Sequence, residues 1–143
     1  MQVVLAVLAD YAATTDDGKL LIAGVFETIN TPALPAVHPM MALALRIAAA
    51  PGEAGNHRLT LKLVDPAGEE VIPALDGEIS LGEMHPVEGG RAQIILNMPG
   101  VKFASAGKHR IDVILDGQLK HSLDLFVRLV PAAEDSGPSR HFH

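Results

Sequence analysis

The sequence predicts an all-β protein, an antiparallel β-sandwich of about 8–9 strands of immunoglobulin-like or C2-like type. Three observations predict it: short segments in which apolar and polar residues alternate, turn signals between the segments, and, in the first 29 residues, neither the caps nor the 3.6-residue period of a helix. The clearest segment is His57–Asp65, where Leu59, Leu61 and Leu63 alternate with polar residues. Many such segments in a short chain are typical of two packed sheets.

The first strands are expected to form a hairpin. Val3–Ala9 is rich in Val and Leu, Thr14–Gly18 has the composition of a turn, and Leu20–Phe26 is the return strand. Asn30–Pro39 carries three prolines and is expected to be an irregular crossover. Met40–Ala49 alternates large with smaller residues and predicts a strand, although its alanines also favour a helix.

The second half of the chain supplies the remaining strands. They are expected at His57–Asp65, Glu70–Ile72, Gly77–Leu81, Ala92–Met98, Lys108–Leu115 and Leu119–Leu129. A three-residue loop between the last two would pair Ile111 with Leu123 and Arg110 with Asp124, which turns both apolar faces toward the core. A two-residue turn at Asp116-Gly117 followed by a bulge is the alternative.

Composition limits both the size and the class of the protein. The 143 residues predict a single β-sandwich domain over residues 1–130 and a C-terminal tail over residues 131–143. A net charge of −6 and 3% aromatic residues argue against nucleic-acid binding. The start of the chain lacks the charged region of a secretion signal, and no apolar stretch reaches the roughly 20 residues of a membrane helix. We therefore expect a cytoplasmic protein without membrane partners.

Few residues suggest catalysis or metal binding. The chain has no Cys, which excludes disulfides, thiolate nucleophiles and Cys-ligated metals. Among seven histidines the weak metal candidates are His38, His57 and His85, which would have to converge from separate loops. Ordinary loop and strand-end histidines are the favoured interpretation, so we expect no cofactor.

Other kinds of site are also disfavoured. The chain lacks a nucleophile elbow and a glycine-rich phosphate loop, so we predict that it is not an enzyme. Asp10 and Tyr11 end an apolar strand, where local hydrogen bonding and ring packing are favoured over a polar pocket. A calcium site that resembles those of C2-like domains is a minor alternative, built from Asp10, Asp16, Asp17 and Asp65.

The early strands are apolar on both faces, unlike the later ones. A two-layer sandwich buries only one face of each sheet, so the second face would be an exposed apolar patch. We therefore expect a homo-oligomer that uses this face. Its predicted interface residues are Ala23, Val25, Ala42, Ala44 and, from the tail, Phe142. Alternatively, the crossover Asn30–Pro39 or the tail covers the face within one chain.

Four motifs carry a resemblance to a known family. They are LADYA from Leu8, DGKLLIAGVFETI from Asp17, PAVHPM from Pro35 and EAGNHRLTLKLVDPAG from Glu53. The chain resembles an uncharacterised bacterial family of small proteins, known only as a domain of unknown function. The resemblance implies a compact all-β bacterial protein and supplies no catalytic residues. The last hairpin looks like the closing hairpin of immunoglobulin-like or C2-like sandwiches.

Two functions follow as hypotheses. The first is a non-enzymatic β-sandwich module for binding or self-assembly, with another protein partner as a further possibility. The alternative is a small-molecule or metal-binding protein, with or without enzymatic activity, that uses the loop histidines.

Overall fold

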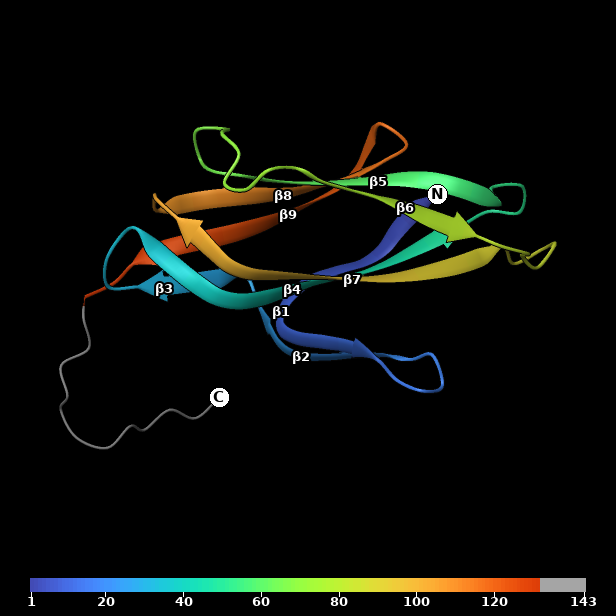
Figure 1. Cartoon of the computed structure of the whole chain (residues 1–143), viewed down its shortest axis with the longest axis horizontal. Helices are drawn as coiled ribbons and strands as arrows, with labels where there is room; N and C mark the ends of the chain where they lie inside the picture. The colour runs from blue at the N-terminus through green and yellow to red at the C-terminus, as the bar shows by residue number, and fades with distance from the viewer. Residues whose placement is uncertain (132–143) are drawn as a thin grey trace.

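The computed structural model describes residues 1–131, and it confirms the all-β prediction (Figure 1). These residues form β1 (Gln2–Thr14), β2 (Leu20–Phe26), β3 (Thr28–Thr31), β4 (Ala36–Ala49), β5 (Gly55–Val64), β6 (Leu75–Leu81), β7 (Gly90–Phe103), β8 (Gly107–Leu115) and β9 (Gln118–Leu129). Within this part of the chain, no helix is long and apolar enough to cross a membrane.

The strands form two sheets that pack face to face. Sheet A has the order β2-β1-β4-β7, and sheet B has the order β3-β9-β8-β5-β6. All pairs are antiparallel except β3 with β9, which is parallel. The core lies between the sheets and takes residues from both of them, among them Leu43 and Leu45 of β4, Ile111 and Val113 of β8, and Phe103 of β7.

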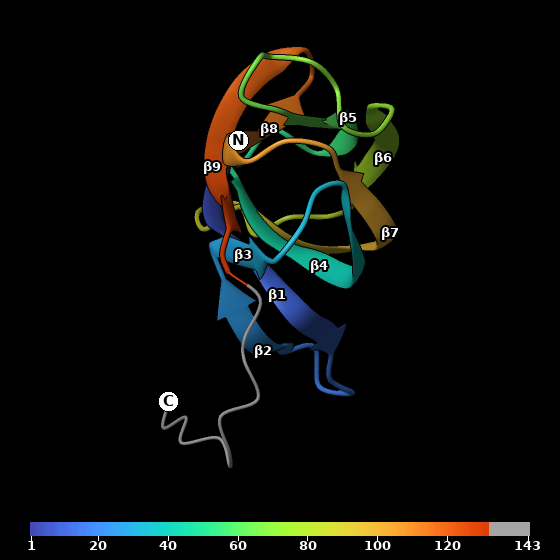
Figure 2. The ribbon, with the colours of Figure 1, turned by 90° about the vertical axis from the view of Figure 1, so that its left-hand side faces the viewer.

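The far part of sheet A, made of the end of β1 and β2, folds over the outer face of the rest of that sheet as a third layer. β1 pairs with β4 only as far as Ala9, after which it bends and continues with β2 as a separate hairpin. We call residues Asp10–Val25 the arm. The arm folds back beneath sheet A, on the side away from sheet B (Figures 1 and 2). A hydrogen bond of 2.9 Å from Gln93 Nε2 of β7 to the Gly18 carbonyl ties its tip to the sheet.

The bend coincides with a close contact between Asp10 and Gly24. These residues are opposite each other in the β1–β2 register, where the regular pairing is interrupted. Gly24 has a φ of +74°, a conformation that other residues adopt only with strain. The Asp10 carboxylate lies over the glycine, so that a Cβ there would come within 2.5 Å of Oδ2. The positive φ therefore favours glycine at the position where the arm departs.

Several predicted boundaries need correction; β7, for example, continues to Phe103 rather than ending at Met98. β1 continues to Thr14, five residues beyond the predicted end at Ala9. β4 begins at Ala36, so the irregular crossover is much shorter than predicted and Pro39 lies within a strand. The proline is accommodated because β4 pairs only with β7 at this point, and a strand edge tolerates a missing N–H. The predicted strand Glu70–Ile72 is only an isolated bridge between Val64 and Glu70.

The β8–β9 hairpin follows the alternative with a bulge. Asp116 and Gly117 form a two-residue turn, both with positive φ (49° and 79°), as a type I′ turn requires. The register then shifts by one residue at Lys120. The shift restores the predicted pairs Ile111–Leu123 and Arg110–Asp124, so both apolar faces meet the core.

Candidate functional site

The outer face of the arm is an exposed apolar surface. Leu20 and Ile22 of β2 pack toward sheet A, so the intervening residues point away from it. The exposed fractions are 56% for Tyr11, 50% for Leu21 and 59% for Val25. Ala23, which pairs with Tyr11 across the hairpin, is also exposed. Ala23 and Val25, two of the predicted interface residues, are therefore accessible to a partner.

Ala42 and Ala44 are placed differently from the prediction. Both lie on the outer face of β4 with no exposed surface, because Ala12, Leu20 and Ile22 of the arm cover them. In this conformation neither alanine is accessible to a second copy. The chain covers the face itself, with the arm rather than with the crossover. Phe142, the fifth predicted interface residue, lies outside the described residues.

The free edge of β2 lacks the features that usually prevent strand edges from pairing with other chains. Charged residues, prolines and bulges serve this purpose on exposed edges. The β6 edge carries Asp76 and Glu78, the β7 edge carries Arg91 and Pro99, and the free part of β9 has its bulge at Lys120. β2 has no charged residue, no proline and no register shift. It is the least protected of these edges in the part of the chain that the structure describes.

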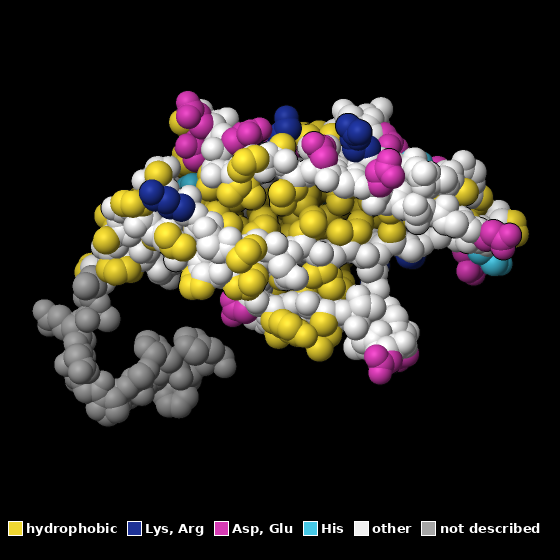
Figure 3. All heavy atoms as spheres, in the orientation of Figure 1, with side chains coloured by type: hydrophobic (Ala, Val, Ile, Leu, Met, Phe, Trp, Pro, Cys, Tyr) yellow, Lys and Arg dark blue, Asp and Glu magenta, His cyan; other side chains and the backbone are white. Residues whose placement is uncertain are grey.

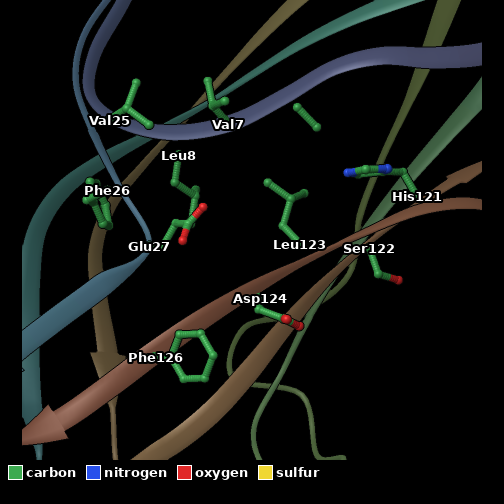
Figure 4. A pocket seen from close by; sticks show the side chains of 11 residues that line it. Val7, Leu8, Val25, Phe26, Glu27, His121, Ser122, Leu123, Asp124 and Phe126 are labelled. Atoms are coloured by element: carbon green, nitrogen blue, oxygen red, sulfur yellow. The ribbon is translucent and has the colours of Figure 1, made fainter.

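A groove opens beside the base of the arm, between β1 and β9 (Figure 4). We call it the edge groove, and its volume is about 260 Å³. Its lining combines apolar side chains with an acidic rim. The apolar side chains include Leu8, Phe26, Leu123 and Phe126, and the rim includes Glu27 and Asp124.

The polar side chains near the edge groove interact with one another. Ser122 Oγ donates to Asp112 Oδ1 at 2.7 Å, and Arg110 donates to both Asp112 oxygens at 2.7 and 3.1 Å. Burial alone would raise the pKa of Asp112, but the hydrogen bonds from Arg110 and Ser122 outweigh it and leave the pKa below its ordinary value. Ser122 is thus bound to a carboxylate that is itself held by a guanidinium, which is unlike an activated nucleophile.

A second groove lies on the opposite side of the sandwich, between β6 and β7. Figure 3 shows hydrophobic side chains gathered along this open side. The groove has a volume of about 500 Å³ and includes Ile79, Leu81 and Ile94. These side chains belong to the main core or pack against it, so this groove is the open margin of the core.

His57 connects two loops through both of its ring nitrogens. Its Nδ1 lies 2.6 Å from Asp116 Oδ2, and its Nε2 lies 2.6 Å from the carbonyl oxygen of Glu53. Both partners are hydrogen-bond acceptors, so the protonated ring, which donates from both nitrogens, is the form that satisfies both contacts. The hydrogen bond to the Asp116 carboxylate, and then the one to the Glu53 carbonyl, raise the pKa of His57. The Arg58 N–H and His57 in turn lower the pKa of Asp116.

The other metal candidates lie in separate parts of the fold. The ring of His38, on β4, packs against that of Phe26 with centroids 5.5 Å apart. His85 Nδ1 accepts hydrogen bonds from the N–H groups of Val87 and Glu88 in the β6–β7 loop. Within residues 1–131, no three His, Asp or Glu side chains are grouped so that they could hold a metal ion.

Three of the carboxylates considered for calcium have local roles. Asp65 Oδ1 accepts from the N–H groups of Ala67 and Glu69 in its turn. Asp17 pairs with Lys19 at 3.2 Å in the tip of the arm. Asp10 lies over Gly24 at the base of the arm. Each of the three carboxylates therefore contacts residues in its own turn or hairpin.

His109 is a buried polar residue that the sequence analysis did not single out. Its side chain is 1% exposed and packs edge-on against Phe103, with ring centroids 5.3 Å apart. Nδ1 lies 3.1 Å from the Gly107 carbonyl, while Nε2 is buried without a hydrogen-bond partner among the described residues. The alternation of His109 with Ile111 and Val113 was the signal that this residue faces the core.

Comparison with known proteins identifies a family without an assigned function. The model of a family of unknown function (DUF6941) matches residues 4–128. No curated protein matches the chain.

Two solved structures have a low similarity to the chain. One is an alkylpurine DNA glycosylase, AlkC, from Pseudomonas fluorescens bound to DNA with an abasic site analog (13% identity, TM-score 0.43). The other is a β-glucosidase from Listeria innocua in complex with isofagomine (13% identity, TM-score 0.47). Each similarity covers 71% of this chain, but only 27% and 14% of the respective structures. At these TM-scores neither structure defines the fold or the function of this chain.

Proposed function

We propose that this chain, which belongs to the family of unknown function DUF6941, is a non-enzymatic β-sandwich module that assembles with a second copy of itself through the arm. One observation carries the proposal. The outer face of the arm exposes Tyr11, Leu21 and Val25 on a hairpin whose free edge, β2, has no charge or proline to oppose pairing.

A two-fold axis beside β2 is the arrangement that fits these features. Two copies of β2 would pair in the antiparallel direction, so each copy presents the same surface to the other. Pairing would satisfy the free backbone groups of the edge and bring the exposed Leu21 and Val25 of both copies together. With Ala23 at the two-fold axis, Leu21 of each copy would lie opposite Val25 of the other.

We also propose that the sandwich is immunoglobulin-like rather than C2-like. The order β1-β4-β7 corresponds to strands A, B and E of that fold, and β9-β8-β5-β6 corresponds to G, F, C and C′. This correspondence of strand order supports the assignment. The arm is an addition to that pattern.

Sedimentation velocity tests the self-assembly. The wild-type chain is compared with Leu21→Glu between about 1 and about 100 µM, the range in which a weak dimer dissociates. Leu119→Glu is the matched control, because Leu119 on β9 is exposed to a similar degree, 61% against 50%. We expect the wild type and Leu119→Glu to gain mass with concentration and Leu21→Glu to remain monomeric. A wild type that is monomeric throughout, or equal effects of the two substitutions, would contradict the proposal.

A further inference from the structure

Two arginines are neighbours on the outer face of sheet A, next to the tip of the arm. Arg46 of β4 is opposite Gln93 of β7, and Arg91 precedes Gln93 by two residues on the same strand. Side chains two residues apart on a strand point to the same face, so the two arginines are diagonal neighbours. Diagonal neighbours are about 7–8 Å apart, a distance that long side chains can bridge. One small ligand can therefore contact both guanidinium groups.

The two arginines line a hollow together with Gly18 and Gln93. The volume of this hollow is about 380 Å³, and small-molecule sites have volumes of about 300–1,000 Å³. Gln93 Oε1 accepts a hydrogen bond of 2.6 Å from Arg46 Nη2, and Gln93 Nε2 donates to the Gly18 carbonyl at 2.9 Å. The amide of Gln93 thus holds both the Arg46 guanidinium and the tip of the arm at the margin of the hollow.

Neither arginine has a carboxylate partner within the described residues. The ion pairs of residues 1–131 do not include Arg46 or Arg91. Arg46 is nevertheless half-buried, and Arg91 Nη1 donates to the Gly90 carbonyl at 3.2 Å. Glu53 and Glu88 line a neighbouring hollow with Arg91, but the Glu53 carboxylate binds the N-terminal ammonium group at 2.8 Å. Two adjacent positive charges repel each other, and an anion between them would replace this repulsion with attraction.

The donors around the hollow fit a phosphate group better than a carboxylate. A phosphate monoester carries a charge of about −1.5 to −2 at pH 7 and has three strong acceptor oxygens. Two guanidinium groups supply a matching charge, and each can bind phosphate through two parallel hydrogen bonds. A carboxylate, with one charge and two oxygens, would pair with one arginine and leave the other without a counter-charge.

We propose that Arg46 and Arg91 bind the phosphate group of a small molecule, which is either inorganic phosphate or a phosphate monoester. The site lies on the outer face of sheet A and not on the outer face of the arm. The proposal therefore does not depend on self-assembly through β2.

A titration followed by nuclear magnetic resonance tests the site. Inorganic phosphate, glycerol phosphate and acetate are added separately to the full chain at constant ionic strength, and the Nε–H signals of the arginines are recorded. We expect saturable shifts of the Arg46 and Arg91 signals with a phosphate dissociation constant of about 0.1–10 mM. Acetate should bind at least about tenfold more weakly, because it engages one guanidinium. The signal of Arg58, which is exposed on β5 of sheet B, is the internal reference.

The two phosphate compounds distinguish the sources of the ligand. Tighter binding of glycerol phosphate would identify a phosphate monoester as the ligand. Equal or tighter binding of inorganic phosphate would identify the free anion.

Substitution of single residues then tests the assignment. Arg91→Gln removes one guanidinium from an exposed position and should weaken phosphate binding at least about tenfold. Gln93→Glu should also weaken it, because a carboxylate of the same shape would pair with Arg46. Arg58→Gln is the matched control and should leave the affinity unchanged. Circular dichroism checks that each variant is folded.

Three results would overturn the proposal. They are shifts that rise linearly with phosphate concentration, shifts of the Arg58 signal as large as those of Arg46 and Arg91, and equal affinities of Arg91→Gln and Arg58→Gln. Repeating the titration with Leu21→Glu added separates these results from any effect of self-assembly.

Discussion

The outer faces of the two sheets avoid a water-exposed apolar surface in different ways. Sheet B presents charged side chains to water, and Arg110 bonds Asp112 while Lys108 lies 3.6 Å from Asp124. Sheet A presents Ala42 and Ala44 on its outer face and hides both under the arm. A β-sandwich can thus avoid an exposed apolar outer face in two ways. The face can carry charged side chains, or another segment of the same chain can cover it.

The arm covers the apolar outer face of sheet A, but it exposes an apolar face of its own. The arm buries its Ala12, Leu20 and Ile22 against sheet A, but its own outer face then exposes Leu21 and Val25. A charged outer face, as in sheet B, has no such consequence. The apolar surface that is open to a partner therefore lies on the outer face of the arm and not on the outer face of β4.

The largest predicted effect is that of a charge beneath the arm. Ala44→Glu places a carboxylate where the side chain has no exposed surface, and an unpaired buried charge costs about 3–5 kcal/mol. Ala23→Glu, compared at a protein concentration too low for self-assembly, is the matched control, because Ala23 is exposed on the other face of the arm. We expect urea denaturation to show a large loss of stability for Ala44→Glu and a change within about 0.5 kcal/mol for Ala23→Glu. Equal losses would mean that the arm does not cover Ala44 in solution.

The next effect concerns the base of the arm. Gly24→Ala should cost about 1–3 kcal/mol, because alanine is strained at a φ of +74° and its Cβ meets the Asp10 carboxylate. Gly52→Ala is a control with a similarly positive φ of 96° but open space around the added Cβ. Urea denaturation should therefore give a larger loss for Gly24→Ala. If the two losses are the same, the Asp10 contact has no separate role in the bend.

A stabilising effect is predicted inside the body of the sandwich. His109→Phe removes the buried Nε2, which has no partner within residues 1–131, and retains an aromatic ring against Phe103. The exposed Gly107 carbonyl, released from Nδ1, can bond water. We expect a gain of about 1–2 kcal/mol in the free energy of unfolding. Lower stability would show that His109 Nε2 has a partner, such as an internal water molecule.

The smallest effect is pH-dependent. The pKa of His57 is raised above its ordinary value of 6.5, so its imidazolium contributes stability that is fully present below pH 6.5 and is lost as pH rises through the folded-state pKa. His57→Gln should therefore lose more stability relative to wild type at about pH 6 than at about pH 9. Denaturant titrations at the two values measure this difference. A constant difference between wild type and variant would contradict a charged His57.

Much of the fold was predictable from local pattern. β2 has the bounds predicted for it, and the alternation within Met40–Ala49 correctly outweighed its helix-favouring alanines. The two apolar faces of the early strands were also predicted correctly. The way in which they are covered was not predictable, because β1 leaves β4 after Ala9 and the residues that cover Ala42 and Ala44 come from the arm, about 20–30 residues earlier in the chain. Periodicity describes the faces of a strand but not the point where it leaves a sheet.

The candidate site was only partly predictable for a similar reason. Ala23 and Val25 were predicted as interface residues because they lie on the second apolar face of an early strand, and both are exposed in the single chain. His57 was considered as a metal ligand, whereas its partner Asp116 lies 59 residues away in a turn. The edge groove joins β1 with β9, two strands at opposite ends of the chain, so no local pattern could indicate it.

Hydrogen exchange of the β2 amides tests the central claim most directly. The exchange of Leu20–Phe26 is compared between a dilute and a concentrated sample, with the free edge of β7, Gly90–Phe103, as the internal reference. If the arm pairs with a second copy, the amides of β2 become more protected at high concentration while those of β7 do not change. Exchange of β2 that is the same at both concentrations would contradict self-assembly through the arm.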